Sequence, residues 1–336
     1  MTRISVIIVN YGTADLVIDS VESVLAQDHG GRTVDVHLID NGSPGDDAAR
    51  LAEAHEARGW GGRVTLYAER ENHGFGRGNN VALRAIAAAP APPDFVFLLN
   101  PDARLANDAI AILADFLERH PDAVAAGAAV QRPDGTKVTA AFRFPSPMRE
   151  FIGPVGIGAL QALFPRQQVA LAPDIARQPV DWVTGAAFMA RFDAMARAGF
   201  FDPDFFLYFE ETELMWRLNE KPGAVWYVPE ARVEHVAGAA TGMKGGRHVS
   251  RALPVYWYDS WRLYHVKTRG VGAARAAALL RLTAAAASRT LGLLRGGSDV
   301  PAHFFRDFGR NVLHPLFLGD PLMARPDGKT IRQRRA

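Results

Sequence analysis

The chain has 336 residues, of which 48% are hydrophobic and 22% are charged, as expected of a globular protein with a substantial core. It contains no cysteine, which excludes disulfides, thiolate metal sites and a catalytic thiol. The formal net charge is only +2, yet residues 251–336 carry a net +10 and the first 250 residues a net −8.

The first 130 residues alternate between short runs rich in β-branched residues and longer segments whose apolar residues have helical spacing. The runs predict strands at residues 4–10, 34–39, 64–67, 95–99 and 124–130. The segments between them predict helices at residues 14–27, 44–58, 79–89 and 108–119. This alternation indicates an α/β fold with a mostly parallel central sheet that is covered by helices on both faces.

The rest of the chain is less regular. We expect a hairpin around Pro133-Asp134-Gly135 and then an irregular region up to residue 180. Further predicted elements are a helix at residues 209–219, strands near 224–228 and 232–236, and two basic helices within 256–295. Residues 238–246 contain four glycines and predict a mobile segment.

No targeting or membrane-spanning segment is predicted. The apolar run at residues 4–9 is too short for a signal peptide. The Ala- and Leu-rich residues 272–294 are interrupted by three arginines, whereas a membrane helix needs roughly 18 or more consecutive apolar residues. We therefore expect a cytoplasmic protein.

Polar side chains follow the first four predicted strands. They are Asn10-Tyr11, Asp40-Asn41, Glu71-Asn72 and Asn100-Pro101-Asp102. Ligands of open α/β sheets bind beyond the carboxyl ends of the strands. One such group would only indicate a turn, because turns favour Asn and Asp, but four of them together indicate a ligand site.

Asp102 is a candidate metal ligand. Mg²⁺ and Mn²⁺ prefer hard oxygen ligands and often take only one or two carboxylates, and Asn100 flanks Asp102. A plain turn is the alternative, since Asn-Pro-Asp is also good turn chemistry. His235, at the end of a predicted strand, is either a further ligand or a structural histidine.

Asp40, Asn10 and Tyr11 are candidates for binding a nucleotide base. A carboxylate at a strand end can accept the ring N–H of uracil or thymine, but Asp40 could equally cap the helix that follows Ser43. Asn10 and Tyr11 either flank the base or simply end their strand.

Residues 71–80 place Gly74, Gly76 and Gly78 before a predicted helix, which allows a ligand to approach the backbone closely. The dinucleotide fingerprint is not met, because Val81 or Asn79 stands where its last glycine is needed. Arg77 either contacts a phosphate or is a solvated surface arginine.

Glu210 and Glu211 open the helix predicted at residues 209–219. Acids in a first turn suit the helix dipole, which is the simplest explanation of the pair. The alternative is that one carboxylate removes a proton from an acceptor hydroxyl as a general base. Trp182, next to Thr184 and Gly185, is either a wall that stacks on a sugar or a buried tryptophan.

Taken together, these motifs resemble family 2 glycosyltransferases of the GT-A fold, and most closely their bacterial rhamnosyltransferase-like branch. The resemblance runs from Ser5 to about His235. It is carried by the order and spacing of six motifs: Val6-Ile7-Ile8-Val9-Asn10-Tyr11, Ile39-Asp40-Asn41-Gly42-Ser43, Asn72-His73-Gly74-Phe75-Gly76-Arg77-Gly78-Asn79-Asn80, Leu98-Leu99-Asn100-Pro101-Asp102, Thr184-Gly185-Ala186 and Phe206-Leu207-Tyr208-Phe209-Glu210-Glu211-Thr212-Glu213-Leu214.

The resemblance implies an inverting transfer of a sugar from a nucleoside-diphosphate donor, with Mg²⁺ or Mn²⁺ bound by Asp102 and His235. Glu211 would be the base, where the family more often has Asp, and Asn100 replaces the first acid of the family's Asp-x-Asp motif. Donor-binding residues would be Asn10, Tyr11, Asp40, Asn72, Arg77, Asn79 and Asn100. Acceptor-binding residues would be Trp182, Thr184, Gly185 and Glu210. Rhamnose from a thymidine-diphosphate donor is the sugar that this branch suggests.

The implied organisation is a catalytic domain at residues 1–250 and a basic helical region at 251–336. The donor half of the domain would end near residue 130. The basic region either lies on the inner face of the plasma membrane, where lipid-linked glycan acceptors reside, or packs on the protein itself. The oligomeric state stays open.

Two other function classes remain as alternatives. A nucleotidyltransferase would need a basic phosphate loop after the first strand, and Asn10-Tyr11-Gly12-Thr13-Ala14-Asp15 has no basic residue. A nucleic-acid-binding protein is disfavoured because the body is acidic and no aromatic-basic module is present, so we expect no nucleic acid partner.

Overall fold

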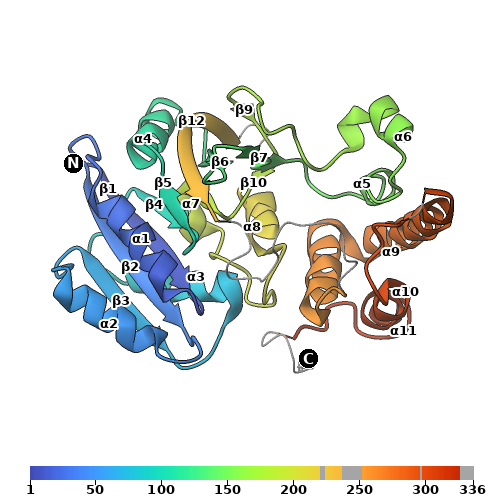
Figure 1. The fold of residues 1–336 in the computed structure, drawn as a ribbon, viewed down its shortest axis with the longest axis horizontal. Coiled ribbons are helices and arrows are strands. Elements are labelled where there is room, and N and C mark those ends of the chain that lie inside the picture. Colours follow the sequence, from blue (N-terminus) through green and yellow to red (C-terminus); the bar gives the residue numbers. More distant parts are fainter. Residues whose placement is uncertain (220–223, 237–251, 296, 326–336) are drawn as a thin grey trace. The chain divides into compact units, whose positions relative to one another are not determined.

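Figure 1 shows the chain in a computed structural model, which describes residues 1–219, 224–236, 252–295 and 297–325. The glycine segment at 238–246, expected to be mobile, lies outside the described residues. The chain divides into two units. The first is Met1–Phe142, Leu171–Asp202 and Leu214–Gly245, and the second is Arg143–Ala170, Pro203–Glu213 and Gly246–Ala336. The domain boundary expected near residue 250 stays a prediction.

The first unit is built around one large sheet. Its strand order is β3 (Val64–Glu69), β2 (Thr33–Asn41), β1 (Arg3–Asn10), β4 (Phe95–Leu99), β11 (Ala187–Arg191), β6 (Ala125–Gln131), β12 (Val225–His235) and β5 (Ala103–Leu105). The pairings among β1 to β4 are parallel, as is that of β6 with β12, which confirms the mostly parallel sheet. Strand β11 runs antiparallel to both of its neighbours.

Short strands extend this arrangement. The hairpin expected near Gly135 is confirmed, because β7 (Lys137–Val138) pairs with β6. β9 (Gln178–Pro179) pairs with β12, and β8 (Ala141–Phe142) pairs with β10 (Trp182–Val183) in a separate two-stranded sheet.

The helices of the first unit follow the predicted alternation. They are α1 (Ala14–Leu25), α2 (Asp47–Ala57), α3 (Gly74–Ala87), α4 (Ala109–Arg119) and α7 (Phe192–Arg197). The strand order runs outward from β1 to β3 and then returns to β4. Right-handed crossovers therefore place α1 and α2 on one face of the sheet and α3 on the other (Figure 1).

The predicted start of α3 is wrong by five residues. The glycines that were expected before the helix form its first two turns, because close packing requires them there. A Cβ on Gly76 would lie 3.0 Å from the Cβ of Phe201, and one on Gly78 would lie 2.9 Å from a methyl carbon of Val9. Contacts with distant residues therefore outweigh the low helix propensity of glycine.

The two strands predicted near 224–228 and 232–236 form the single strand β12. Its register against β6 shifts between Val228 and Arg232, which is the bulge that made the sequence resemble two strands. Pro229 lies in this irregular stretch and has no N–H to donate to a neighbouring strand.

The second unit is helical. It contains α5 (Arg149–Ile152), α6 (Gly158–Leu163), the 3₁₀ turn η1 (Pro165–Gln167), the long α9 (Val255–Arg295), α10 (Phe304–Phe308), the π-helical turn η2 (Gly309–Leu313) and α11 (His314–Leu318). The two predicted basic helices are confirmed as the halves of α9, which meet at Gly270 with φ 81°. Tyr258, Trp261, Phe304 and Phe308 are fully buried at the centre of the unit.

Several arginines of the basic region form hydrogen bonds or ion pairs within this unit. The fully buried Arg262 donates to the backbone carbonyls of Asn311, Pro321 and Met323. Arg281 forms an ion pair of 2.9 Å with the buried Glu150. No helix in the described part of the chain has the length and apolar character needed to cross a bilayer.

The residues of helix α8 (Glu210–Leu218) are divided between the two units. Its first turn, Glu210 to Glu213, belongs to the second unit and its remainder to the first. The helix predicted at residues 209–219 is thereby confirmed.

Candidate active site

The carboxyl ends of β1, β2 and β4 lie at the same edge of the sheet, as predicted. Asn10 is in register with Asp40, and Ile8 is in register with Leu99, the residue before Asn100. The polar residues that follow these strands therefore share one rim of the first unit.

The side chain of Asn10 organises the β1 end of this rim. It is fully buried, and its amide nitrogen lies 3.0 Å from carboxylate oxygens of both Asp40 and Asp47. Its amide oxygen accepts from the hydroxyl and the backbone N–H of Thr13. Tyr11, by contrast, is 40% exposed and available for a ligand.

Asp40 is only 2% exposed. Besides Asn10, its carboxylate accepts a long hydrogen bond of 3.4 Å from the backbone N–H of Ser43. Helix α2 begins at Asp47, so Asp40 holds the turn before this helix and does not cap the helix itself.

The segment after β3 is anchored by Asn41, a strand-end residue for which no individual role was predicted. The side chain of Asn41 donates to Asn72 and to the carbonyl of Gly74, and it accepts from the backbone N–H of His73. Asn72 also accepts from the N–H of Gly74 at 2.8 Å. The loop and the first turn of α3 are thus fixed to the end of β2.

Gly42 makes this close approach possible. Its φ is +66°, and a Cβ at this position would lie 2.5 Å from the carbonyl carbon of Glu71. Both the backbone conformation and the space require glycine.

Two other predicted donor-binding residues make local contacts in α3. Arg77 donates from Nε to the carbonyl of His73 at 2.8 Å, and Asn79 donates to the carbonyl of Phe75 at 2.9 Å. No role was predicted for the next residue, Asn80, either. Its side-chain amide donates a hydrogen bond to the backbone carbonyl of Phe201 and accepts one from the backbone N–H of Phe201. Asparagine is a poor helix former. Two adjacent Asn residues in a predicted helix therefore indicated that their side chains make specific contacts.

Asn100, Asp102 and His235 come together beyond the end of β4. His235 Nε2 lies 2.9 Å from an oxygen of Asp102 and 3.3 Å from the amide nitrogen of Asn100. The antiparallel pairing of β5 with β12 sets His235 opposite Ala103, and the N–H of Val236 donates to the carbonyl of Asp102. Sequence positions more than 130 residues apart are thereby joined.

Trp182 lies on β10 and stacks on Phe142, with ring centroids 4.1 Å apart and planes inclined by 15°. The backbone N–H of Thr184 donates to Ala140, and Gly185 is buried. One face of the half-buried indole is therefore covered by Phe142, and its role as a sugar wall stays a prediction.

The acid pair opens α8 in the second unit. Glu210 is 3% exposed, and both acids have one buried carboxylate oxygen without a hydrogen-bond partner among the described residues. Burial raises the pKa of Glu211 and, together with the charge of Glu211, raises that of Glu210 well above its usual range. A carboxylate with a raised pKa is a stronger proton acceptor, as a general base requires.

The backbone before this pair is strained. Tyr208 and Phe209 have φ values of 71° and 66°, in the left-handed region that aromatic residues rarely adopt. Such strain is concentrated at functional sites, so it marks this segment as a candidate site. The strain could be found only from the structure.

Residues 5–161 match a family model described as glycosyl transferase family 2. The chain carries a family 2 glycosyltransferase domain. It is 29% identical over 232 residues to the N-acetylglucosaminyl-diphospho-decaprenol L-rhamnosyltransferase of Mycobacterium tuberculosis, covering 65% of this chain and 72% of that protein. It is 25% identical over 169 residues to the rhamnosyltransferase WbbL of Escherichia coli K12, covering 49% and 61%.

Solved glycosyltransferase structures share the fold. The mannosyltransferase PcManGT from Pyrobaculum calidifontis, in complex with GDP-Man and Mn²⁺, aligns with a TM-score of 0.54 at 16% identity, covering 95% of this chain and 81% of that one. TarS 1-349 of S. aureus with UDP-GlcNAc aligns with a TM-score of 0.51 at 15% identity, covering 93% and 79%. The expected GT-A fold of this family 2 glycosyltransferase is confirmed.

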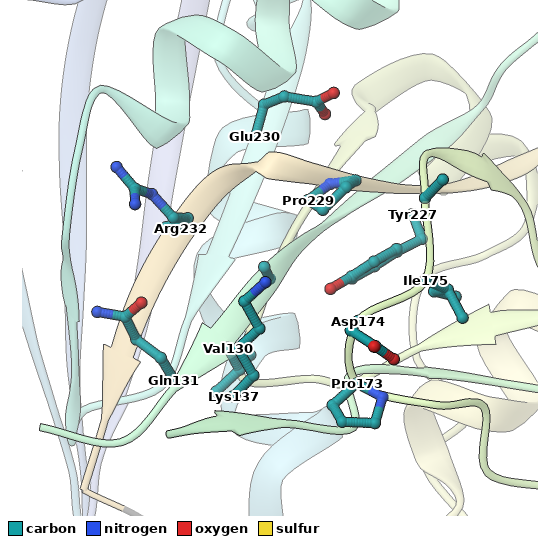
Figure 2. Close-up of a pocket in the computed structure, with 12 residues that line it drawn as sticks. Val130, Gln131, Lys137, Pro173, Asp174, Ile175, Tyr227, Pro229, Glu230 and Arg232 are labelled. Carbon is teal, nitrogen blue, oxygen red and sulfur yellow. The ribbon is translucent and has the colours of Figure 1, made fainter. Parts of the chain in front are cut away.

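A cavity of about 570 Å³ lies elsewhere in the first unit of this glycosyltransferase. Figure 2 shows Gln131 and Arg232, from β6 and β12, on one side of it, and Asp174 and Tyr227 on the other. None of the predicted site residues lines this cavity.

Proposed function

We propose that this family 2 glycosyltransferase moves a sugar, with inversion, from a nucleoside-diphosphate donor to a lipid-linked glycan acceptor of the cell envelope, and that it needs a divalent cation. The observation that carries the proposal is the meeting of Asp102, His235 and Asn100 beyond β4. These three side chains lie on the rim that also bears Asn10 and Asp40.

The chemistry of this group suits Mg²⁺ or Mn²⁺. Asp102 offers a hard carboxylate oxygen and His235 an imidazole nitrogen, and the two atoms are already 2.9 Å apart. Within the described ranges no group of three or more His, Cys, Asp or Glu side chains gathers as a metal site, so donor phosphates would complete the coordination. A cation there would neutralise charge developing on the diphosphate leaving group.

Glu211 is the proposed base. Its carboxylate takes the proton of an acceptor hydroxyl, whose oxygen bonds to the anomeric carbon of the donor sugar. The bond between that carbon and the diphosphate oxygen breaks, and its electron pair leaves with the nucleoside diphosphate. The partial exposure of Glu211 and its raised pKa support this role.

The relatives suggest the substrates. Both are rhamnosyltransferases by name, and one name specifies an N-acetylglucosaminyl-diphospho-decaprenol acceptor. We therefore propose rhamnose from dTDP-rhamnose, with Asp40, Asn72, Arg77 and Asn79 lining the donor side.

A panel of nucleotide sugars tests the proposal. Release of nucleoside diphosphate would be measured with N-acetylglucosaminyl diphosphate on a short prenyl chain, with Mg²⁺, with Mn²⁺ and with a chelator. We expect activity with dTDP-rhamnose that the chelator abolishes. Asp102→Asn and Glu211→Gln should each lower kcat about 100-fold or more, whereas the exposed Asp193→Asn is a matched control. Activity unchanged by chelation would refute the metal assignment, and full activity in Glu211→Gln would refute the base.

We further propose that the second unit contacts the inner face of the membrane. Among the described residues, eight of the eleven exposed large hydrophobic side chains belong to this unit. The most exposed are Leu163, Leu293 and Leu318. Replacing these three by Ser should reduce sedimentation with anionic liposomes, and unchanged sedimentation would refute the contact.

A further inference from the structure

Three aromatic side chains gather next to the acid pair in the second unit. Tyr256, in the first turn of α9, has its ring centroid 5.3 Å from that of Phe206 and 6.0 Å from that of Tyr208. The two tyrosine rings are inclined by only 24°. All three residues are partly exposed, whereas Tyr258 and Trp261 on the same helix are completely buried. Core packing alone does not explain this partial exposure.

The segment that bears Phe206 and Tyr208 is fixed to α9. Asp204 forms an ion pair of 2.7 Å with Lys267, and the Ser260 hydroxyl donates to the carbonyl of Leu207 at 2.9 Å. Phe209 packs on Tyr264 with ring centroids 5.5 Å apart. These anchors hold the left-handed conformations of Tyr208 and Phe209, which a free loop would relax.

The aromatic cluster and the acids are within electrostatic reach of each other. Burial raises the pKa of the Tyr208 hydroxyl, and the charges of Glu210 and Glu211 raise it further. A sugar ring has apolar C–H groups, which pack on aromatic faces, and hydroxyls, which donate to carboxylates. Aromatic faces next to the partly exposed Glu211 match both requirements.

We propose that Phe206, Tyr208 and Tyr256 form a platform on which a neutral sugar ring of the acceptor stacks, which brings one of its hydroxyls to Glu211. This inference rests on the proposed function for the role of Glu211 as base. It adds a binding site for the acceptor sugar, built by the segment before α8 and the first turn of α9.

Binding measured without turnover tests the platform. Saturation-transfer NMR with methyl N-acetyl-β-D-glucosaminide would compare the wild type with Tyr256→Phe and Tyr256→Leu. We expect the ring protons of the probe to receive saturation in the wild type and in Tyr256→Phe, and about tenfold weaker binding in Tyr256→Leu. Phe305→Leu, at an aromatic that packs on Phe304 in the same unit, is the matched control.

A kinetic measurement separates stacking from folding. In Tyr256→Leu the KM for the prenyl-linked acceptor should rise about tenfold, and Tyr256→Phe should restore it. Equal probe binding in the wild type and Tyr256→Leu, or no binding in the wild type, overturns the platform. Normal, Tyr256-dependent probe binding without transfer from any donor would instead refute the proposed function and leave the platform standing.

Discussion

Replacing Glu210 by Gln should make the protein more stable at neutral and alkaline pH. A carboxyl group whose pKa is higher in the folded than in the unfolded chain binds its proton more tightly when folded. Relative to the neutral Gln variant, the wild type loses no stability below the ordinary pKa of 4.5, and it loses progressively more as the pH rises through the raised pKa.

The expected size of the effect follows from the burial of Glu210. The residue is 3% exposed, and one of its oxygens has no partner among the described residues. An unpaired buried polar group costs about 1–3 kcal/mol and an unpaired charge costs more, so replacing the carboxylate by a neutral amide removes the excess. We therefore expect Glu210→Gln to raise the free energy of unfolding at pH 8 by about 1–3 kcal/mol, or Tm by several degrees.

Glu150 offers a matched control, because it is a buried glutamate of the same unit with the opposite pKa shift. Burial would raise the pKa of Glu150, but Arg281 and His265 outweigh it and lower the pKa to about 2. Each pKa unit is worth about 1.4 kcal/mol, so Glu150→Gln should destabilise the protein by about 3 kcal/mol above pH 4.5. This loss should shrink as the pH falls from 4.5 towards 2.

Thermal unfolding of the three proteins between pH 4 and pH 8 checks the reasoning. The two Glu→Gln variants should have shifts of opposite sign at pH 8, and the shift of Glu210→Gln should vanish towards pH 4. A Glu210→Gln protein that is less stable than the wild type at pH 8 would show that the carboxylate is well solvated or paired, and would refute the reasoning.

Other substitutions test the packing that positions the rim. Gly42→Ala should cost about 2 kcal/mol or more in thermal unfolding, because φ is +66° and the new Cβ would strike the backbone after β3; an unchanged Tm would contradict the close approach. Gly127→Ala places a Cβ 2.5 Å from the Cβ of Val183, so Val183→Gly, which removes that atom, should recover part of the lost stability in a double-mutant cycle, and strict additivity would count against this contact. Asn80→Ala removes both hydrogen bonds to Phe201 and should cost about 1–3 kcal/mol, measured by denaturant unfolding.

The parallel half of the sheet was predictable because its signals are local. Each of β1, β2, β3 and β4 is a short apolar run, and the helices between them fix the parallel direction. Once the strands are parallel, the meeting of Asn10, Asp40 and Asn100 at one rim follows from topology alone.

What the sequence did not predict depends on contacts between distant residues. Strand β11 lies between β4 and β6 in the sheet although it follows both of them in the chain, and no local pattern predicts its direction. The hydrogen bonds between Asn80 and Phe201 join residues that are 121 positions apart in the chain. The start of α3 at Gly74 is decided by the same neighbour, because Gly76 packs on Phe201.

The acid pair shows this limit most clearly. The sequence places Glu210 and Glu211 in a first helical turn, where solvated acids are common and need no function. Their burial, their unpartnered oxygens and the strained backbone of Tyr208 are tertiary properties. A solvated pair that only suits the helix dipole does not need these properties, and the role of Glu211 as a base stays a prediction.

Some arginines of the basic C-terminal region are used in contacts within their own unit. A net charge of +10 does not distinguish arginines that face solvent from arginines that hold the fold together. Arg262 is fully buried on backbone carbonyls, and Arg281 is paired with Glu150. Because arginines held in such contacts contribute little to attraction at a distance, the membrane contact proposed for this unit is better tested at exposed apolar side chains such as Leu293 and Leu318.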